Sequence, residues 1–301
     1  MRPLRQLAAL SLAPRPALEE GRLPGPRRRH GGQEKRQAEL LDRWLAARRQ
    51  QTIELMTEAL AVCDASGAAR HLAKLVHDLV DWYAPRRPAG VGPALAALAP
   101  LLAPFTPHLA EAIYCQTSQR EADSVHLLDW PTADPAAIDG HLLSGMALVR
   151  RLADLGQAAR ARAAVPAAPP VRRAWIGFVP PEAAEPLLDE ALLAEALGAG
   201  RLKVTPDALT KVAWHLALDP QQAIGRGISP AEIDAVLTRL APEATVALLS
   251  QVWSGRSVGL EVSGRAVTLL PDELAADVQA LPGCAAAVEP GRLVVLELEG
   301  P

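Results

Sequence analysis

Hydrophobic residues recur at helical spacing through the first half of the chain. Between residues 39 and 63, apolar side chains return every three or four positions, and most arginines lie off that stripe. The same spacing continues over 68–83, 94–116 and 136–163. The helix predicted at 68–83 is expected to end before Pro85, because the residue before a proline is biased away from helical conformation. Four long helices with short connections predict an antiparallel bundle.

The helix predicted at 94–116 contains "LLAPFTPHLAEAIY", residues 101–114, in which prolines interrupt an amphipathic pattern. A proline inside a helix costs about 3 kcal/mol, whereas the first helical turn tolerates it. We therefore predict two short helices with a break between Pro104 and Pro107. Thr106 is predicted to cap the second of them, and Phe105 is expected to pack inward.

The pattern changes beyond the proline-rich break at 165–173. Short alternating runs predict strands, and Ser263-Gly264 between two of them predicts a β-hairpin. The predicted strands are 174–179, 211–218, the two arms of 257–271 and 292–299, and the predicted helices are 182–197, 230–240 and 243–252. The predicted fold class is thus a mainly α helical bundle followed by a small α+β domain.

These changes in pattern divide the chain into three predicted parts. Residues 1–38 form an Arg/Pro-rich tail, 39–165 the helical bundle, and 166–301 the α+β module. The tail contains "RRRH" at 27–30 and shows no sustained period. Two interpretations of it stay open: a flexible, solvated extension, or a basic arm that contacts phosphates.

Composition places the chain among globular proteins of two domains. Its 301 residues are 50% hydrophobic but only 3% aromatic, and the net charge is −3. That charge argues against avid nucleic-acid binding unless basic residues are segregated on one surface. The three cysteines are scattered, as expected of reduced thiols in a cytoplasmic protein. No apolar run approaches the roughly 20 residues that span a membrane, so no membrane partner is expected.

A search of the sequence for catalytic motifs finds none. There is no GxxxxGK[ST] phosphate loop, no GxSxG and no HExxH, and the seven histidines do not cluster at ligand spacing. We therefore predict no catalytic residue and no metal site from the residues themselves.

Aromatic and basic residues concentrate instead at the breaks between helices. The candidates are Trp82, Tyr83, Arg86, Arg87, Arg160, Arg162 and Arg172. Aromatic rings can stack on unpaired bases, and arginine can bind phosphate through two hydrogen bonds. The alternative is that the aromatic residues fill the core and the arginines are solvated.

Four sequence blocks occur in order: "LDRW" at 41–44, "WYAPRR" at 82–87, "LLAPFTPHLAE" at 101–111 and "SVHLLDWP" at 124–131. This ordered set resembles the anticodon-binding domain of isoleucyl-tRNA synthetase and, more weakly, that of the valyl and leucyl enzymes. Later segments look like the α+β module that follows the bundle in that family. The resemblance covers roughly 39–299.

The resemblance implies a tRNA-binding role without a catalytic one. The HIGH and KMSKS signatures that a class I synthetase carries on its catalytic domain are absent here. By resemblance, Trp82, Tyr83 and the arginines named above would contact tRNA. ATP and magnesium would be needed only by a separate catalytic half. Several basic positions of the family are alanine or proline here, for example in "APRRPAGVGP", which removes phosphate contacts.

Three functions remain open. The first is a stand-alone module that binds the anticodon stem and loop of a tRNA, with the isoleucine acceptor as the expected tRNA and a separately encoded catalytic subunit as a partner. The second is a truncated fragment or split subunit of an isoleucine–tRNA ligase. The third is a degenerate paralogue that acts as a protein-interaction module.

Overall fold

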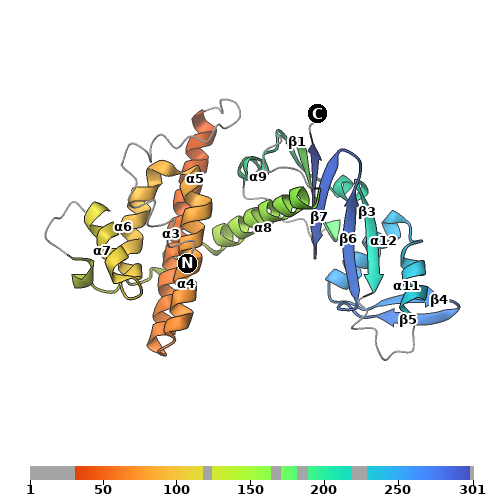
Figure 1. Ribbon diagram of the computed structural model, residues 1–301, viewed down its shortest axis with the longest axis horizontal. Coiled ribbons are helices and arrows are strands. Elements are labelled where there is room, and N and C mark those ends of the chain that lie inside the picture. The colour runs from red at the N-terminus through yellow and green to blue at the C-terminus, as the bar shows by residue number, and fades with distance from the viewer. Residues whose placement is uncertain (1–30, 118–123, 164–170, 182–188, 219–228, 299–301) are drawn as a thin grey trace. The chain divides into compact units, whose positions relative to one another are not determined.

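The structure, a computed structural model, describes residues 31–117, 124–163, 171–181, 189–218 and 229–298 (Figure 1). Contacts within the chain divide it into two compact units, Met1–Ser144 and Gly145–Pro301. The first unit is helical in its described part, and the second contains every strand that the structure describes. The predicted fold class is therefore confirmed.

Helices make up the first unit. In chain order they are α3 (Gly31–Ala61), α4 (Ala65–His77), the π-helix η1 (Asp78–Tyr83), α5 (Ala84–Arg86), η2 (Pro88–Gly90), α6 (Val91–Leu102), α7 (Pro107–Thr117), η3 (Val125–Leu127), η4 (Pro135–Ala137) and the start of α8 (Gly140–Arg162). The apolar stripes form the core, where Trp44, Met56 and Leu79 are no more than 2% exposed. Asp64 caps α4 by accepting a hydrogen bond from the Gly67 N–H.

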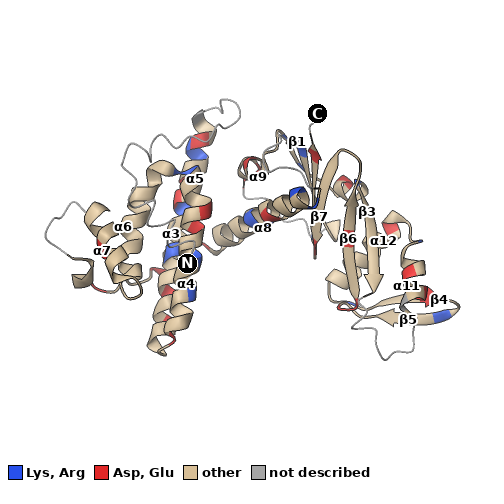
Figure 2. Ribbon diagram, viewed as in Figure 1, with Lys and Arg blue, Asp and Glu red and all other residues tan. Residues whose placement is uncertain are grey.

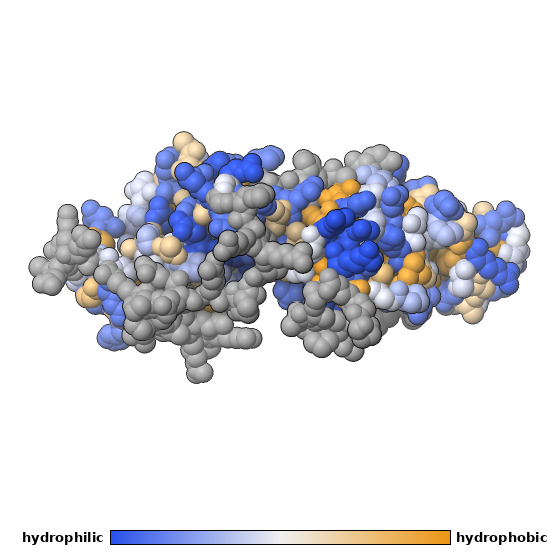
Figure 3. All heavy atoms as spheres, turned by 90° about the horizontal axis from the view of Figure 1, so that it is seen from above, coloured by the Kyte–Doolittle hydropathy of each residue, from blue (hydrophilic) through white to orange (hydrophobic). Residues whose placement is uncertain are grey.

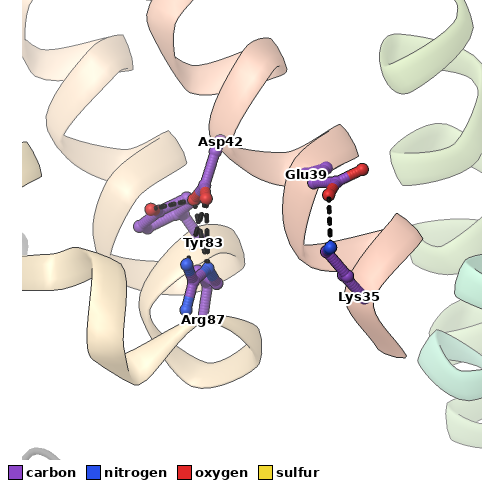
Figure 4. Close-up of polar contacts among 5 residues, drawn as sticks. All are labelled: Lys35, Glu39, Asp42, Tyr83 and Arg87. Carbon is purple, nitrogen blue, oxygen red and sulfur yellow. Dashed lines mark hydrogen bonds and ion pairs between the residues drawn. The ribbon is translucent and has the colours of Figure 1, made fainter. Parts of the chain in front are cut away.

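The helix α3 begins at Gly31, earlier than the predicted residue 39. Its first turns are polar, but Gln37 is buried, and Lys35 Nζ lies 3.9 Å from Glu39 Oε1 (Figure 4). Residues 31–38, which composition assigned to the tail, are therefore helical. The rest of the predicted tail lies outside the described residues.

The expectation that a helix ends before Pro85 is wrong. The backbone passes from α4 into the π-helix η1 and continues into α5, where Pro85 lies in the first turn. The Ala84 N–H donates to the Leu79 carbonyl, five residues back. This wider turn shifts the hydrogen-bond register one residue before the proline, so Pro85 sits where a missing N–H costs little.

The break between Pro104 and Pro107 is confirmed, because α6 ends at Leu102 and α7 begins at Pro107. Phe105 is only half-buried. The Thr106 hydroxyl, which was predicted to cap α7, instead donates to the Leu102 carbonyl at 3.3 Å.

The second unit is built on a four-stranded sheet with the order β2-β1-β8-β7. Its strands are β1 (Val171–Phe178), β2 (Leu202–Val204), β7 (Cys284–Glu289) and β8 (Arg292–Leu298). The β1–β2 pair is parallel, and the other pairs of this sheet are antiparallel. Two separate two-stranded sheets contain the remaining strands. One pairs β3 (Val212–Leu218) with β6 (Leu274–Ala280), and the other pairs β4 (Val258–Val262) with β5 (Arg265–Leu269).

Short helices accompany these sheets, namely α9 (Glu190–Ala196), η6 (Pro206–Thr210), α11 (Pro230–Leu237) and α12 (Pro242–Trp253). The predicted hairpin is confirmed: Ser263 and Gly264, with φ of 52° and 76°, form the two-residue turn between β4 and β5. The predicted helix at 182–197 is described only from α9 onward, since 182–188 lie outside the described residues. Strands β2, β6 and β7 had no counterpart in the predicted elements.

Most of α8 belongs to the second unit by its contacts, because the division between the units falls between Ser144 and Gly145. Gly156 is the point at which α8 packs closely against the second unit. A Cβ added there would lie 2.2 Å from a Leu197 methyl and 3.8 Å from Val294. The helices within the described ranges include none with the length and apolar character needed to cross a bilayer.

Candidate nucleic-acid interface

Two of the predicted site residues, Tyr83 and Arg87, converge on Asp42 of α3 (Figure 4). The Tyr83 hydroxyl donates to Asp42 Oδ1 at 2.6 Å. Arg87 Nε lies 3.2 Å from both carboxylate oxygens, and its Nη2 lies 3.1 Å from Oδ2. This cluster connects the end of η1 and the residue after α5 to α3, so both side chains have a structural role in the bundle.

Replacing Tyr83 with phenylalanine is expected to remove a pH dependence of stability. Burial, the hydrogen bond to Asp42 and the charge of Asp42 raise the pKa of Tyr83 above its ordinary 10.0, although Arg87 opposes this. Because the folded pKa is raised, the contribution is fully present below pH 10 and is lost as the unfolded tyrosine ionises above it, by about 1.4 kcal/mol per pH unit. Urea unfolding between pH 9 and 11 measures this difference.

Tyr114→Phe is the matched control, because the half-buried Tyr114 lies on α7 and forms no hydrogen bond with a carboxylate among the described residues. Its alkaline stability profile should follow that of the parent protein. Identical profiles for Tyr83→Phe and the parent would contradict the role assigned to the Tyr83 hydroxyl.

Trp82 and Arg86 form a second contact among the predicted residues. Trp82 is buried, and the Arg86 guanidinium carbon lies 3.8 Å from the centroid of its ring. Arg86 Nη1 also donates to the Trp82 carbonyl at 3.1 Å. The indole therefore packs inside the bundle, and the cation–π contact holds the guanidinium at the end of η1.

The other three predicted arginines belong to the second unit. Arg160 is buried, its Nη2 donates to the Leu197 carbonyl at 2.7 Å, and burial lowers its pKa. Arg162 pairs with Asp277, and Arg172 Nη1 lies 3.6 Å from Glu297 Oε1. The side chains of Arg162 and Arg172 are 49% and 68% exposed, so these two can reach a ligand.

A cavity of about 240 Å³ opens between α3, η1 and α6 beside the Asp42 cluster. Its walls are mostly apolar, and Asp42 and Arg49 supply the charges. Arg49 Nε is buried, and Arg49 makes no hydrogen bond or ion pair within the part of the chain that the structure describes. The sequence did contain a signal for this site, because Asp42, Leu45 and Arg49 follow helical spacing on one face.

A second basic group, absent from the sequence predictions, surrounds Trp175 of β1. Lys211 Nζ, the Arg173 guanidinium carbon and Lys203 Nζ lie 4.3, 5.0 and 5.4 Å from its ring centroid. Lys203 and Lys211 come from segments more than 25 residues further along the chain, so no local pattern connects them with Trp175.

The residues that carry the sequence resemblance bond to one another. Asp42 of the first block contacts Tyr83 and Arg87 of the second. Glu111 of the third block accepts from the Ser124 hydroxyl at 2.8 Å and the Val125 N–H at 3.0 Å in the fourth. The four blocks therefore hold the helical unit together, whatever else they contact.

The charges of the surface are mixed. Figure 2 shows Lys and Arg beside Asp and Glu along α3, with no long stretch of one sign. In Figure 3, hydrophilic and hydrophobic residues lie side by side on the visible face of the strand-rich unit. Within the described ranges, no group of three or more His, Cys, Asp or Glu side chains is placed to hold a metal ion.

The helical part of the chain matches a known family of domains. Residues 42–174 match the family model described as the anticodon-binding domain of tRNA ligase. The chain thus carries an anticodon-binding domain, which confirms the resemblance. The match begins inside α3 and extends beyond the end of α8.

The chain is also similar to several isoleucine–tRNA ligases. The chain is 33% identical over 283 residues to that of Thermus thermophilus and 31% identical over 275 residues to that of Streptomyces coelicolor. Both matches cover 86% of this chain but only 27% and 26% of the ligases. The enzyme of Methanopyrus kandleri is 34% identical over 167 residues, which is 49% of this chain and 16% of that ligase. The chain therefore spans about a quarter of the length of the Thermus and Streptomyces ligases.

Proposed function

We propose that the chain binds tRNA through its anticodon-binding domain, and that the anticodon stem and loop of the isoleucine acceptor is the part bound. The match of residues 42–174 to the anticodon-binding family carries this proposal. The similarity to isoleucine–tRNA ligases beyond the bundle supports the choice of tRNA.

The structure refines which side chains are proposed to contact RNA. Arg162 and Arg172 are exposed enough to reach phosphates, and the half-buried Arg86 is the last residue of α5. To these we add Arg49, whose charge is not neutralised by a partner within the described residues. Trp82, Tyr83, Arg87 and Arg160 are proposed to act by holding the surface in shape.

The proposal also assigns catalysis elsewhere. Adenylate formation would need a separate catalytic half with its own ATP and magnesium site. Purified protein mixed with tRNA, isoleucine and ATP is expected to form no isoleucyl-tRNA. Measurable aminoacylation by this chain alone would contradict that part of the proposal.

Replacing Arg49 with glutamine is expected to weaken tRNA binding by about three- to tenfold and to lower the salt slope of log Kd by about 0.9, as for one lost phosphate contact. Filter binding of isoleucine-acceptor tRNA between about 50 and 200 mM salt measures both. Arg43→Gln is the matched control: it removes the same charge from α3, but Arg43 is already paired with Asp139 at 3.4 Å.

Equal losses for Arg49→Gln and Arg43→Gln would remove Arg49 from the interface. Absence of tRNA binding by the parent protein at micromolar concentration and about 50 mM salt would overturn the proposed function itself. In that case, the hypothesis that the chain is a protein-interaction module would be preferred.

A further inference from the structure

A cavity of about 360 Å³ lies against the four-stranded sheet of the second unit. The strand register aligns Arg173 with Glu297 and Glu297 with Cys284 across β1, β8 and β7. It also pairs Trp175 with Lys203 of β2. Since Arg173 and Trp175 are two residues apart on one strand, they face the same side of the sheet and form the floor of the cavity.

Positive charge dominates this cavity. Arg173 and Lys211 line it, and Lys203 lies at its edge, 5.4 Å from the ring of Trp175. Glu297 is the only carboxylate among the lining residues, and Arg172 and Arg173 already share it at 3.6 and 3.8 Å. Lys203 and Lys211 form no ion pair with any described residue.

The indole explains how these like charges can remain together. Trp175 is buried, and its ring attracts all three cations through the negative face of the π-system. Leu281 and Leu298 complete the walls. A cation would be repelled from this cavity, whereas an anion with several oxygens could accept from the arginine fork and the lysine together.

We propose that this cavity binds phosphate groups, supplied either by the phosphodiester backbone of RNA or by the phosphate chain of a free nucleotide or pyrophosphate. The RNA source rests on the proposed function, whereas the free phosphate source does not. The cavity volume falls in the range of small-ligand sites. It is formed wholly within the second unit, by residues 173–298, and lies almost entirely outside the match to the anticodon-binding family.

Cys284 provides a reporter inside the cavity. Its thiol is half-buried, whereas Cys63 and Cys115 are exposed and can be changed to serine to leave one reactive thiol. Burial and Glu297 raise the pKa of the Cys284 thiol, and Lys211 opposes them. A phosphate bound to Lys211 would weaken this opposing effect and block access, so alkylation by iodoacetamide should become slower.

The experiment measures the alkylation rate of Cys284 in full-length Cys63→Ser/Cys115→Ser protein. One arm titrates pyrophosphate against sodium chloride of equal ionic strength, and the other titrates isoleucine-acceptor tRNA. Saturable protection that sodium chloride does not reproduce is the expected result. Protection by pyrophosphate alone identifies a free phosphate as the source, and protection by tRNA identifies the RNA backbone.

Three variants test whether the protection of Cys284 arises from phosphate bound in this cavity. Lys211→Gln should raise the half-protecting concentration about tenfold, which corresponds to the loss of one charge-assisted hydrogen bond. Glu297→Gln should lower it, because it removes the only carboxylate lining the cavity. Arg256→Gln, an exposed arginine of the same unit, should leave it unchanged.

Absence of protection in both arms would overturn the proposal, even if tRNA binds elsewhere on the chain. So would equal changes for Lys211→Gln and Arg256→Gln. Protection by pyrophosphate without any tRNA binding would instead remove the proposed function and leave this site standing. The strengthened binding expected of Glu297→Gln keeps the test decisive if Lys211→Gln is unstable.

Discussion

Replacing Asp78 with alanine is expected to lower the free energy of unfolding of the helical unit by about 3 kcal/mol. Asp78 Oδ2 accepts from Arg48 Nε at 2.8 Å, and the two side chains are only 4% and 18% exposed. Removing the carboxylate leaves the Arg48 cation in a poorly hydrated position. Such an uncompensated charge costs several times more than a surface ion pair is worth.

Native-state hydrogen exchange of the α3 and α4 amides measures this loss without contributions from the second unit. The matched control is Asp81→Ala on the same π-helix. Asp81 pairs with His77, but both side chains are about half exposed, so a loss below about 1 kcal/mol is expected. Equal losses for the two variants would mean that burial does not set the strength of the Arg48–Asp78 pair.

The double variant Arg48→Met/Asp78→Leu separates the charge from the packing. If the cost of Asp78→Ala is an unpaired cation, replacing both partners with apolar side chains should recover most of the lost stability. A double variant as unstable as Asp78→Ala would instead indicate that the shape of this pair is irreplaceable.

The helical unit was predictable because its signals are local. Periodic apolar positions give the helices, prolines give the α6–α7 break, and Asp64 gives a cap. The π-helix η1 escaped prediction because one extra residue in a turn leaves the apolar stripe nearly unchanged. A proline inside such a stripe therefore marks either a helix end or a widened turn, and periodicity alone does not distinguish them.

Strands β6 and β7 escaped prediction for a different reason. The segments of β6 and β7, "LAADVQA" and "CAAAVE", are rich in alanine and carry little intrinsic strand preference. They become strands because β3 and β8 supply hydrogen-bonding partners, and Ala285–Ala287 are then almost completely buried. Tertiary pairing decides the conformation where local propensity is weak.

The candidate site was predictable in composition but not in role. Aromatic and basic residues at helix ends did indicate a distinctive surface, yet Asp42, which binds Arg87, lies 45 residues away in sequence. The cations around Trp175 meet only through strand pairing and the start of β3. Which carboxylates reach a charged side chain, and how exposed that side chain stays, are set by the three-dimensional fold and not by local sequence.

Replacing Arg160 with glutamine is expected to lower the free energy of unfolding of the second unit by about 2 kcal/mol while leaving tRNA affinity of the folded protein within about twofold. The Arg160 guanidinium is buried and donates to the Leu197 carbonyl at 2.7 Å, at the end of α9. The loss reflects a missing charged hydrogen bond and a carbonyl left without its donor. To contact a phosphate, the guanidinium would first have to give up this bond.

Arg162→Gln, at the same end of α8, should behave in the opposite way. Its partner Asp277 is exposed, so the variant should change stability by less than about 1 kcal/mol. If Arg162 contacts a phosphate, it should weaken tRNA binding and reduce the salt slope by about 0.9. Urea unfolding and filter binding on both variants check this reciprocal pattern. An Arg160→Gln protein of unchanged stability but weakened tRNA binding would show that the arginine contacts RNA directly, and that the Leu197 hydrogen bond is dispensable.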